Sequence, residues 1–188
     1  MEVIIVLIIV VVVGYLIYQS LPNTKFQKAQ NLFNSKDYVQ AIDILNTIFD
    51  KHNDAPAKLA ECKLNLGKRA STKSEKVKFF KEVTEIRKRI SKSESIAKLD
   101  HIEANALFEI AKIQYEETNG DIDKLNQNIK FIDTANKKGF ESDFSSLKEK
   151  HFYDLASSHF KKATDKEKSN KYPDAIQLYK KAIECSEK

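Results

Sequence analysis

The chain has 188 residues and a formal net charge of +5, which indicates one compact domain or one domain with an appendage. Hydrophobic residues make up 41% and charged residues 31% of the chain, a composition too apolar for a disordered protein. Only 4 glycines and 3 prolines are present, too few for the many turns of a β-sandwich or barrel. We therefore expect an all-α fold.

A long apolar run opens the sequence, from Val3 to Tyr18, and it contains no charged side chain. A helix from Val3 to Leu21 would be about 28 Å long, close to the hydrocarbon thickness of a bilayer. In lipid, a single segment satisfies its backbone hydrogen bonds only as a helix. We therefore predict a transmembrane anchor over residues 1–21 and a helical domain over residues 22–188.

Three residues of this run have predicted roles in the membrane. Tyr15 and Tyr18 lie three residues apart near the downstream end, where amphipathic rings favour the headgroup interface. Gly14 stands among β-branched residues, and a glycine lets a neighbouring membrane helix approach closely. It is the residue through which the anchors of several copies would pack.

The charges that flank the run predict which way it crosses the membrane. Lys25, Lys28 and Lys36 follow it, whereas only Met1 and Glu2 precede it, so the positive-inside rule puts the helical domain in the cytoplasm. A cleaved signal peptide is the alternative, but it needs a basic start and a small-residue cleavage site. Because neither pattern is present, we predict a single-pass protein of the cell membrane.

Downstream of Pro22 the apolar positions recur every three to four residues, which is the period of an α-helix. Short polar turns interrupt this period, and we predict eight helices joined as antiparallel hairpins. Their expected spans are about 24–35, 38–52, from an N-cap at Asp54 to near Gly67, 73–91, 94–117, 122–138, from Ser142 or Ser145 to 169, and 172–186.

Two segments that lie 134 residues apart share one pattern, in which a small residue is followed by a tyrosine and then an Ala-Ile pair. The matching positions are Ala29 and Ala163, Tyr38 and Tyr172, and Ala41 and Ala175. This pattern resembles the tetratricopeptide (TPR) repeat, a helical hairpin with small and aromatic residues at fixed places. A weaker copy surrounds Gly120, and residues 56–92 match by helix length alone.

The resemblance implies a TPR-like stack of hairpins whose groove binds a peptide or a partner protein. The expected role is a membrane-tethered scaffold or adaptor that binds a protein at the cytoplasmic face. The alternative is a homo-oligomeric membrane pore or effector assembled through the N-terminal helix. We expect no small-molecule substrate and no cofactor.

Positive charge is concentrated between Lys68 and Lys92, which enclose ten Lys or Arg residues against three Glu. Such a segment suits an anionic lipid surface, at about 1 kcal/mol per basic residue, or an acidic protein. A solvated helix face is the plain alternative, and nucleic acid is the least favoured ligand. The predicted contact residues are Arg69, Lys76, Lys81, Arg87, Lys88 and Arg89.

The sequence carries no recognisable catalytic motif. Phosphate-binding loops and nucleophile elbows need closely spaced glycines, and four scattered ones do not supply them. His151, Asp154 and His159 share one helix face, but a full set of metal ligands is not visible. Cys62 and Cys185 are too far apart in sequence for a thiol zinc motif. We therefore expect neither an enzyme nor a metal site.

Overall fold

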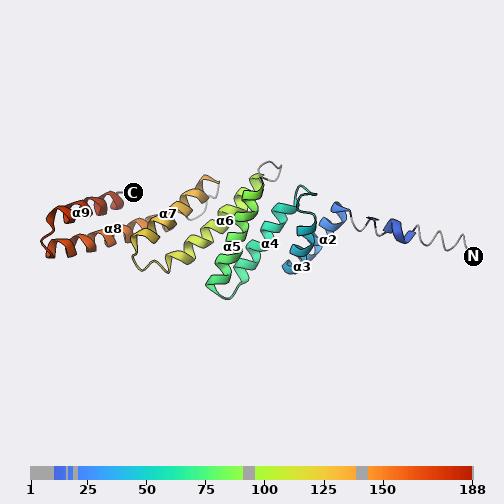
Figure 1. Ribbon diagram of the computed structural model, residues 1–188, viewed down its shortest axis with the longest axis horizontal. Helices are drawn as coiled ribbons and strands as arrows, with labels where there is room; N and C mark the ends of the chain where they lie inside the picture. The colour runs from blue at the N-terminus through green and yellow to red at the C-terminus, as the bar shows by residue number, and fades with distance from the viewer. Residues whose placement is uncertain (1–10, 16, 19–20, 91–95, 139–143, 188) are drawn as a thin grey trace, which may run out of the picture.

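The computed structural model describes residues 11–15, 17–18, 21–90, 96–138 and 144–187, apart from the side chains of residues 144 and 145. Within these residues the regular structure is all helical, and helices α2 to α9 follow one another along an elongated row (Figure 1). The helices span Pro22–Asn34, Tyr38–Thr47, Ala55–Arg69, Lys73–Arg89, Ile96–Tyr115, Ile122–Lys137, Phe144–Lys168 and Tyr172–Ser186. The predicted all-α fold is thus confirmed for the described residues.

The helix ends agree with the prediction to within a few residues except at the end of α3. That helix was expected to reach His52, but it ends at Thr47. Ile48 and Phe49 are buried in the turn that follows, and the ring of His52 stacks on Phe26 with the ring centroids 4.0 Å apart. The turn therefore buries the same apolar residues that a longer helix would, and periodicity alone does not separate the two cases. The expected junctions at 91–95 and 139–143 lie outside the described residues.

The first and the last hairpin turn with the same backbone geometry. Lys36 and Asn170 both have a left-handed conformation, with φ of 67° and 57°. The residue after each one donates its backbone N–H to a carbonyl five residues earlier: Asp37 to Leu32, and Lys171 to Lys166, both at 2.9 Å. This six-residue closure is a Schellman-type helix end. The sequence pattern shared by these two segments is therefore matched by a shared local structure.

The hairpins stack by one repeated rule. The first helix of each hairpin contacts both helices of the hairpin before it: α4 contacts α2 and α3, α6 contacts α4 and α5, and α8 contacts α6 and α7. α9, by contrast, contacts only α8 among the described helices. Each hairpin is thus covered on one face by the hairpin that follows, up to the α8–α9 hairpin.

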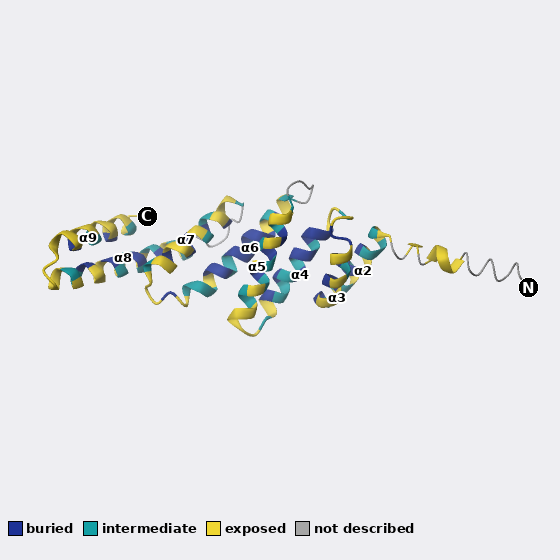
Figure 2. Cartoon of the chain, viewed as in Figure 1, coloured by how far each residue is buried: buried dark blue, intermediate teal, exposed yellow. Residues whose placement is uncertain are grey.

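The hydrophobic core thins toward the C-terminal end of the row. Its largest cluster joins α2 to α6, and Figure 2 shows the buried residues concentrated over α4 and α6. The α8–α9 hairpin joins the row through two much smaller clusters: Leu155 packs with residues of α7, and Leu147 packs against a cluster formed by α6 and α7. Because buried apolar area sets most of the packing energy, this joint is the weaker part of the stack.

The predicted membrane anchor lies largely outside the described residues. Residues 11–15 and 17–18 are helical, and Gly14, Tyr15 and Tyr18 are exposed. Within the described part of the chain, no helix combines the length and the apolarity needed to cross a membrane. The anchor over residues 1–21 therefore remains a sequence-based prediction.

Gly67 marks the closest approach of α4 and α5. A Cβ atom at this position would lie 2.7 Å from Cδ1 of Phe80, well inside van der Waals contact. Phe80 is 1% exposed and belongs to the main core, so its ring has no open space to move into. Gly67 is therefore required by packing between the two helices and not by backbone conformation.

We predict that Gly67→Ala destabilises the protein although alanine is the better helix former by about 1 kcal/mol. Overpacking a filled core costs about 1–3 kcal/mol, so the net change is a loss of about 1 kcal/mol in the free energy of unfolding. Urea denaturation of the wild-type protein and of Gly67→Ala measures this difference in the free energy of unfolding. In a Phe80→Leu background the same substitution should be neutral or stabilising, and a stabilising effect in both backgrounds would contradict the packing argument.

Candidate functional site

Exposed apolar side chains gather on the α8–α9 hairpin. Figure 2 shows how little of α9 is buried in comparison with α4 and α6. The large exposed side chains of this hairpin are Tyr153, Phe160, Tyr172, Ile176 and Ile183. Elsewhere in the described chain, exposed large apolar side chains occur only at residues 11–21 and at Val39. A cluster of this kind on a water-soluble surface is typical of an interaction site.

The same hairpin contains an uncharged groove of about 580 Å³. Small residues from each helix alternate with large ones along it: α8 provides Tyr153, Ala156, Ser157 and Phe160, and α9 provides Tyr179, Ala182, Ile183 and Ser186. The rings of Phe160 and Tyr179 meet nearly edge to face, with their centroids 5.3 Å apart. We call this groove, together with the exposed side chains of Tyr172 and Ile176 on the same hairpin, the α8–α9 groove.

Hydrogen bonds hold one wall of the α8–α9 groove in place. The hydroxyl of Tyr179 donates to Oε2 of Glu167 at 2.8 Å and lies 3.3 Å from the hydroxyl of Thr164. The ring is therefore fixed by its hydroxyl end while the side chain lines the groove. A preformed apolar wall of this kind loses little conformational entropy when a ligand binds.

A comparison within the chain shows that the exposed positions are core positions elsewhere. The first and last hairpins align with a constant shift of 134 residues. Four large residues of the first hairpin are between 6% and 9% exposed, and their counterparts in the last hairpin are between 55% and 58% exposed. The four pairs are Phe26 and Phe160, Tyr38 and Tyr172, Ile42 and Ile176, and Phe49 and Ile183.

This surface could not be identified from periodicity, because the period gives the apolar positions of a helix but does not show whether a neighbouring helix covers them. The signal that would have found it is the repeat itself. In the first hairpin these side chains are buried by the helices that follow, whereas α9 is the last described helix. Core-type residues on a hairpin that no described helix covers form an exposed apolar face.

The opposite face of α8 is buried and holds two histidines. Nδ1 of His151 donates to the carbonyl of Leu147 at 2.7 Å, and the ring lies 4.4 Å from that of Tyr115. The hydroxyl of Tyr115 in turn donates to Asp154, and burial together with this carboxylate raises the pKa of Tyr115. Nε2 of His151 has no hydrogen-bond partner among the described residues.

Burial lowers the pKa of both histidines on this face. For His151 it outweighs the hydrogen bond to Leu147 and the charge of Asp154. For His159, Lys181 and Lys162 add to the effect of burial. Both rings are therefore neutral near pH 7, and protonation would put a charge on the buried face of α8.

We predict that the protein loses stability as the pH falls below about 6.5, the ordinary value for histidine. The lowered pKa means that the unfolded chain takes up protons first, so the free energy of unfolding decreases with falling pH until the folded histidines titrate. One such histidine contributes a slope of at most about 1.4 kcal/mol per pH unit. His151→Gln should reduce the slope measured by urea denaturation between about pH 6.5 and pH 5, and equal slopes would contradict this assignment.

The three arginines of the predicted basic contact set contact other hairpins, although Arg69 and Arg89 are themselves exposed. Arg69 places its guanidinium 4.7 Å from the ring centroid of Tyr38, and Arg89 does so 4.1 Å from that of Phe49. Arg87 forms an ion pair with Asp100, from its Nε to Oδ1 at 2.6 Å. These contacts join neighbouring hairpins, so much of the local positive charge serves packing.

Among the described residues, the lysines of the set form no ion pair and no aromatic contact with another hairpin. Lys88 pairs with Glu85 on its own helix at 2.6 Å, and both side chains are largely in solvent. Lys81 is exposed, Lys76 is partly exposed, and no ion pair joins either one to another described residue. Lys76 and Lys81 are thus the members of the predicted set whose charge is not used by a close partner in the described chain.

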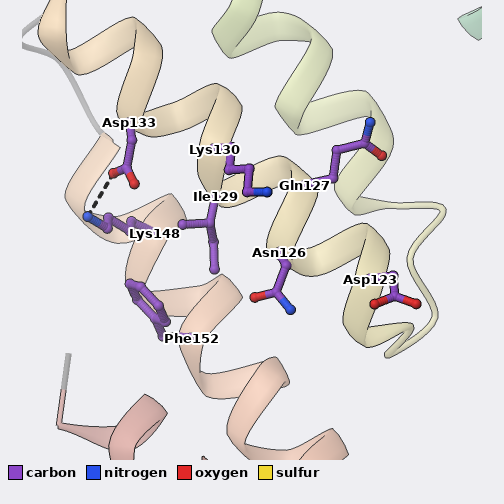
Figure 3. A pocket seen from close by; sticks show the side chains of 8 residues that line it. All are labelled: Asp123, Asn126, Gln127, Ile129, Lys130, Asp133, Lys148 and Phe152. Atoms are coloured by element: carbon purple, nitrogen blue, oxygen red, sulfur yellow. Dashed lines mark hydrogen bonds and ion pairs between the residues drawn. The ribbon is translucent and has the colours of Figure 1, made fainter.

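A second groove lies between α7 and α8, and it is polar (Figure 3). Its volume is about 900 Å³, and Asp133 and Lys148 close one end with an ion pair of 2.9 Å. Figure 3 shows Ile129 near Phe152 in the middle and Asp123 toward the far end. Its two carboxylates and two ammonium groups balance, so this groove offers no net charge to a ligand.

The described residues contain no cluster of metal-ligating side chains. No group of three or more His, Cys, Asp or Glu residues lies close enough there to hold a metal ion. Burial raises the pKa of the Cys62 thiol to about 12, which keeps it protonated and unreactive. Among the described surfaces, the α8–α9 groove, with its exposed apolar side chains, is therefore the candidate binding site.

Comparisons with known proteins do not assign a family. No protein-family model matches the sequence, and a search of the curated proteins finds no significant relative. The function is consequently inferred from the residues of this chain and from their geometry.

Proposed function

We propose that the protein is a TPR-like scaffold that recruits a partner protein through the α8–α9 groove. One observation carries the proposal: side chains that are buried in the first hairpin are more than half exposed at the same register in the last one. Burying such a side chain is worth about 1.5–3 kcal/mol, so a partner that covers several of them binds with useful affinity. The TPR resemblance, which implies protein binding, supports the same role.

The second part of the proposal is the tether. The apolar run from Val3 to Tyr18 would anchor the protein, and the lysines that follow it would place the helical domain on the cytoplasmic side of the cell membrane. Recruitment then means a higher local concentration of the partner at the membrane. Lys76 and Lys81 are the residues that remain available for an acidic surface nearby.

We predict that affinity purification of the full-length protein from detergent-solubilised membranes captures a distinct protein, identified by mass spectrometry. Introducing a carboxylate into the α8–α9 groove should reduce this capture about tenfold or more, because the bound partner would bury the new charge. Ile176→Glu and Ile183→Glu are the test variants. Val39→Glu, which also replaces an exposed apolar residue but on α3, is the matched control and should leave capture unchanged.

Two results would contradict the proposal. Equal capture by the groove variants would mean that the partner binds elsewhere. A large homo-oligomer that contains no second protein and requires residues 3–18 would favour the pore or effector alternative.

A further inference from the structure

The first hairpin shows which kind of element covers a face of this type. α4 lies against both α2 and α3. Its buried residues Ala55, Leu59 and Cys62 are spaced by three and four residues and therefore share one side of the helix. An apolar stripe of this kind allows one helix to pack against two neighbours at once.

Two basic side chains of α4 contact aromatic rings of the first hairpin. Arg69 stacks over the ring of Tyr38, and its Nη1 donates to the carbonyl of Lys36 at 3.4 Å. Lys58 has its Nζ 4.2 Å from the ring centroid of Phe33. Lys58 and Arg69 are eleven residues apart, about three helical turns, and therefore lie on the same side of α4.

The last hairpin keeps the features that α4 contacts in the first. With the shift of 134 residues, Tyr172 takes the place of Tyr38 and offers an exposed ring. Glu167 takes the place of Phe33, and its carboxylate is exposed. A basic side chain at the position of Lys58 would meet a negative charge there in place of an aromatic ring. The chemistry of the last hairpin is thus complementary to a helix with the pattern of α4.

We propose that the α8–α9 groove binds an amphipathic helix supplied by a partner protein, which docks as α4 docks on α2 and α3. The same docking rule holds for α6 and α8 on the hairpins before them, so the groove is the next position of an established series of interfaces. The partner helix has an apolar face, an arginine that stacks on Tyr172, and a lysine or arginine about three turns before it that faces Glu167. This inference rests on the proposed function and names its ligand class.

A peptide copy of α4 is the direct probe. A fluorescent peptide of residues 54–70, blocked at both ends, is titrated with the full-length protein in detergent, and its anisotropy is followed. We expect saturable binding that Ile176→Glu and Ile183→Glu each weaken by about tenfold or more and that Val39→Glu leaves unchanged. All three side chains are more than half exposed, and circular dichroism verifies that the variants keep their helix content.

The charged positions give a second readout. A peptide carrying Arg69→Glu should bind more weakly. The loss from a Lys58→Glu peptide should become smaller when the protein carries Glu167→Gln, which removes the charge but keeps an acceptor for the hydroxyl of Tyr179. An equal effect of Lys58→Glu on both proteins would overturn the assigned orientation of the helix.

Three results would overturn the inference as a whole. They are no binding of the peptide, binding that the groove variants do not weaken, and a dimer of the protein that Ile183→Glu dissociates but the peptide does not. The last result would assign the groove to a second copy of the chain. If partner capture from membranes still depends on Ile176 and Ile183 while the peptide fails, the recruiting function stands and only the ligand class is wrong.

Discussion

The structure depends on one constraint: a two-helix hairpin cannot bury its apolar residues alone and needs the next hairpin to cover one of its faces. α4, α6 and α8 each meet this need for the hairpin before them by contacting both of its helices. Tyr38 shows the result, because Arg69 of α4 lies over its ring and the side chain is almost fully buried. The α8–α9 hairpin has the same kind of face, and no described helix covers it.

This constraint also explains how the basic segment is used. In a stack, each joint between hairpins needs contacts at its edges as well as in its core. Arg87 pairs with Asp100 across one such joint, and Lys138 joins the same carboxylate at 3.0 Å. Arg89 covers Phe49 in the same way that Arg69 covers Tyr38. Residues that suggested a contact with lipid or protein are thus partly engaged in holding neighbouring hairpins together.

The sequence predicted those features that depend on neighbours along the chain. Helix periodicity and turn residues were sufficient for the eight helices, and the Tyr38 and Tyr172 patterns marked two turns that share one backbone geometry. The predicted end of α3 was wrong, because Ile48 and Phe49 are apolar residues that suit burial whether the chain continues as a helix or turns. Only packing against other helices decides between those two cases.

The candidate site was not predictable in the same way. Ile42 and Ile176 are the same residue type in the same local pattern, yet one is buried and the other exposed. Their difference comes from a neighbouring helix far along the sequence, which local patterns do not encode. The roles of Arg69 and Arg89 were missed for the same reason, since the aromatic rings that they cover lie on other helices.

No described helix covers the α8–α9 face, and we expect the partner to cover it on binding. Hydrogen–deuterium exchange of the full-length protein tests this most directly, because amides in weakly packed helices open more often. We expect α9 to exchange faster than α3 in the free protein and to slow markedly in the purified complex. Equal protection of α3 and α9 without a partner, or unchanged exchange of α9 in the complex, would contradict this account.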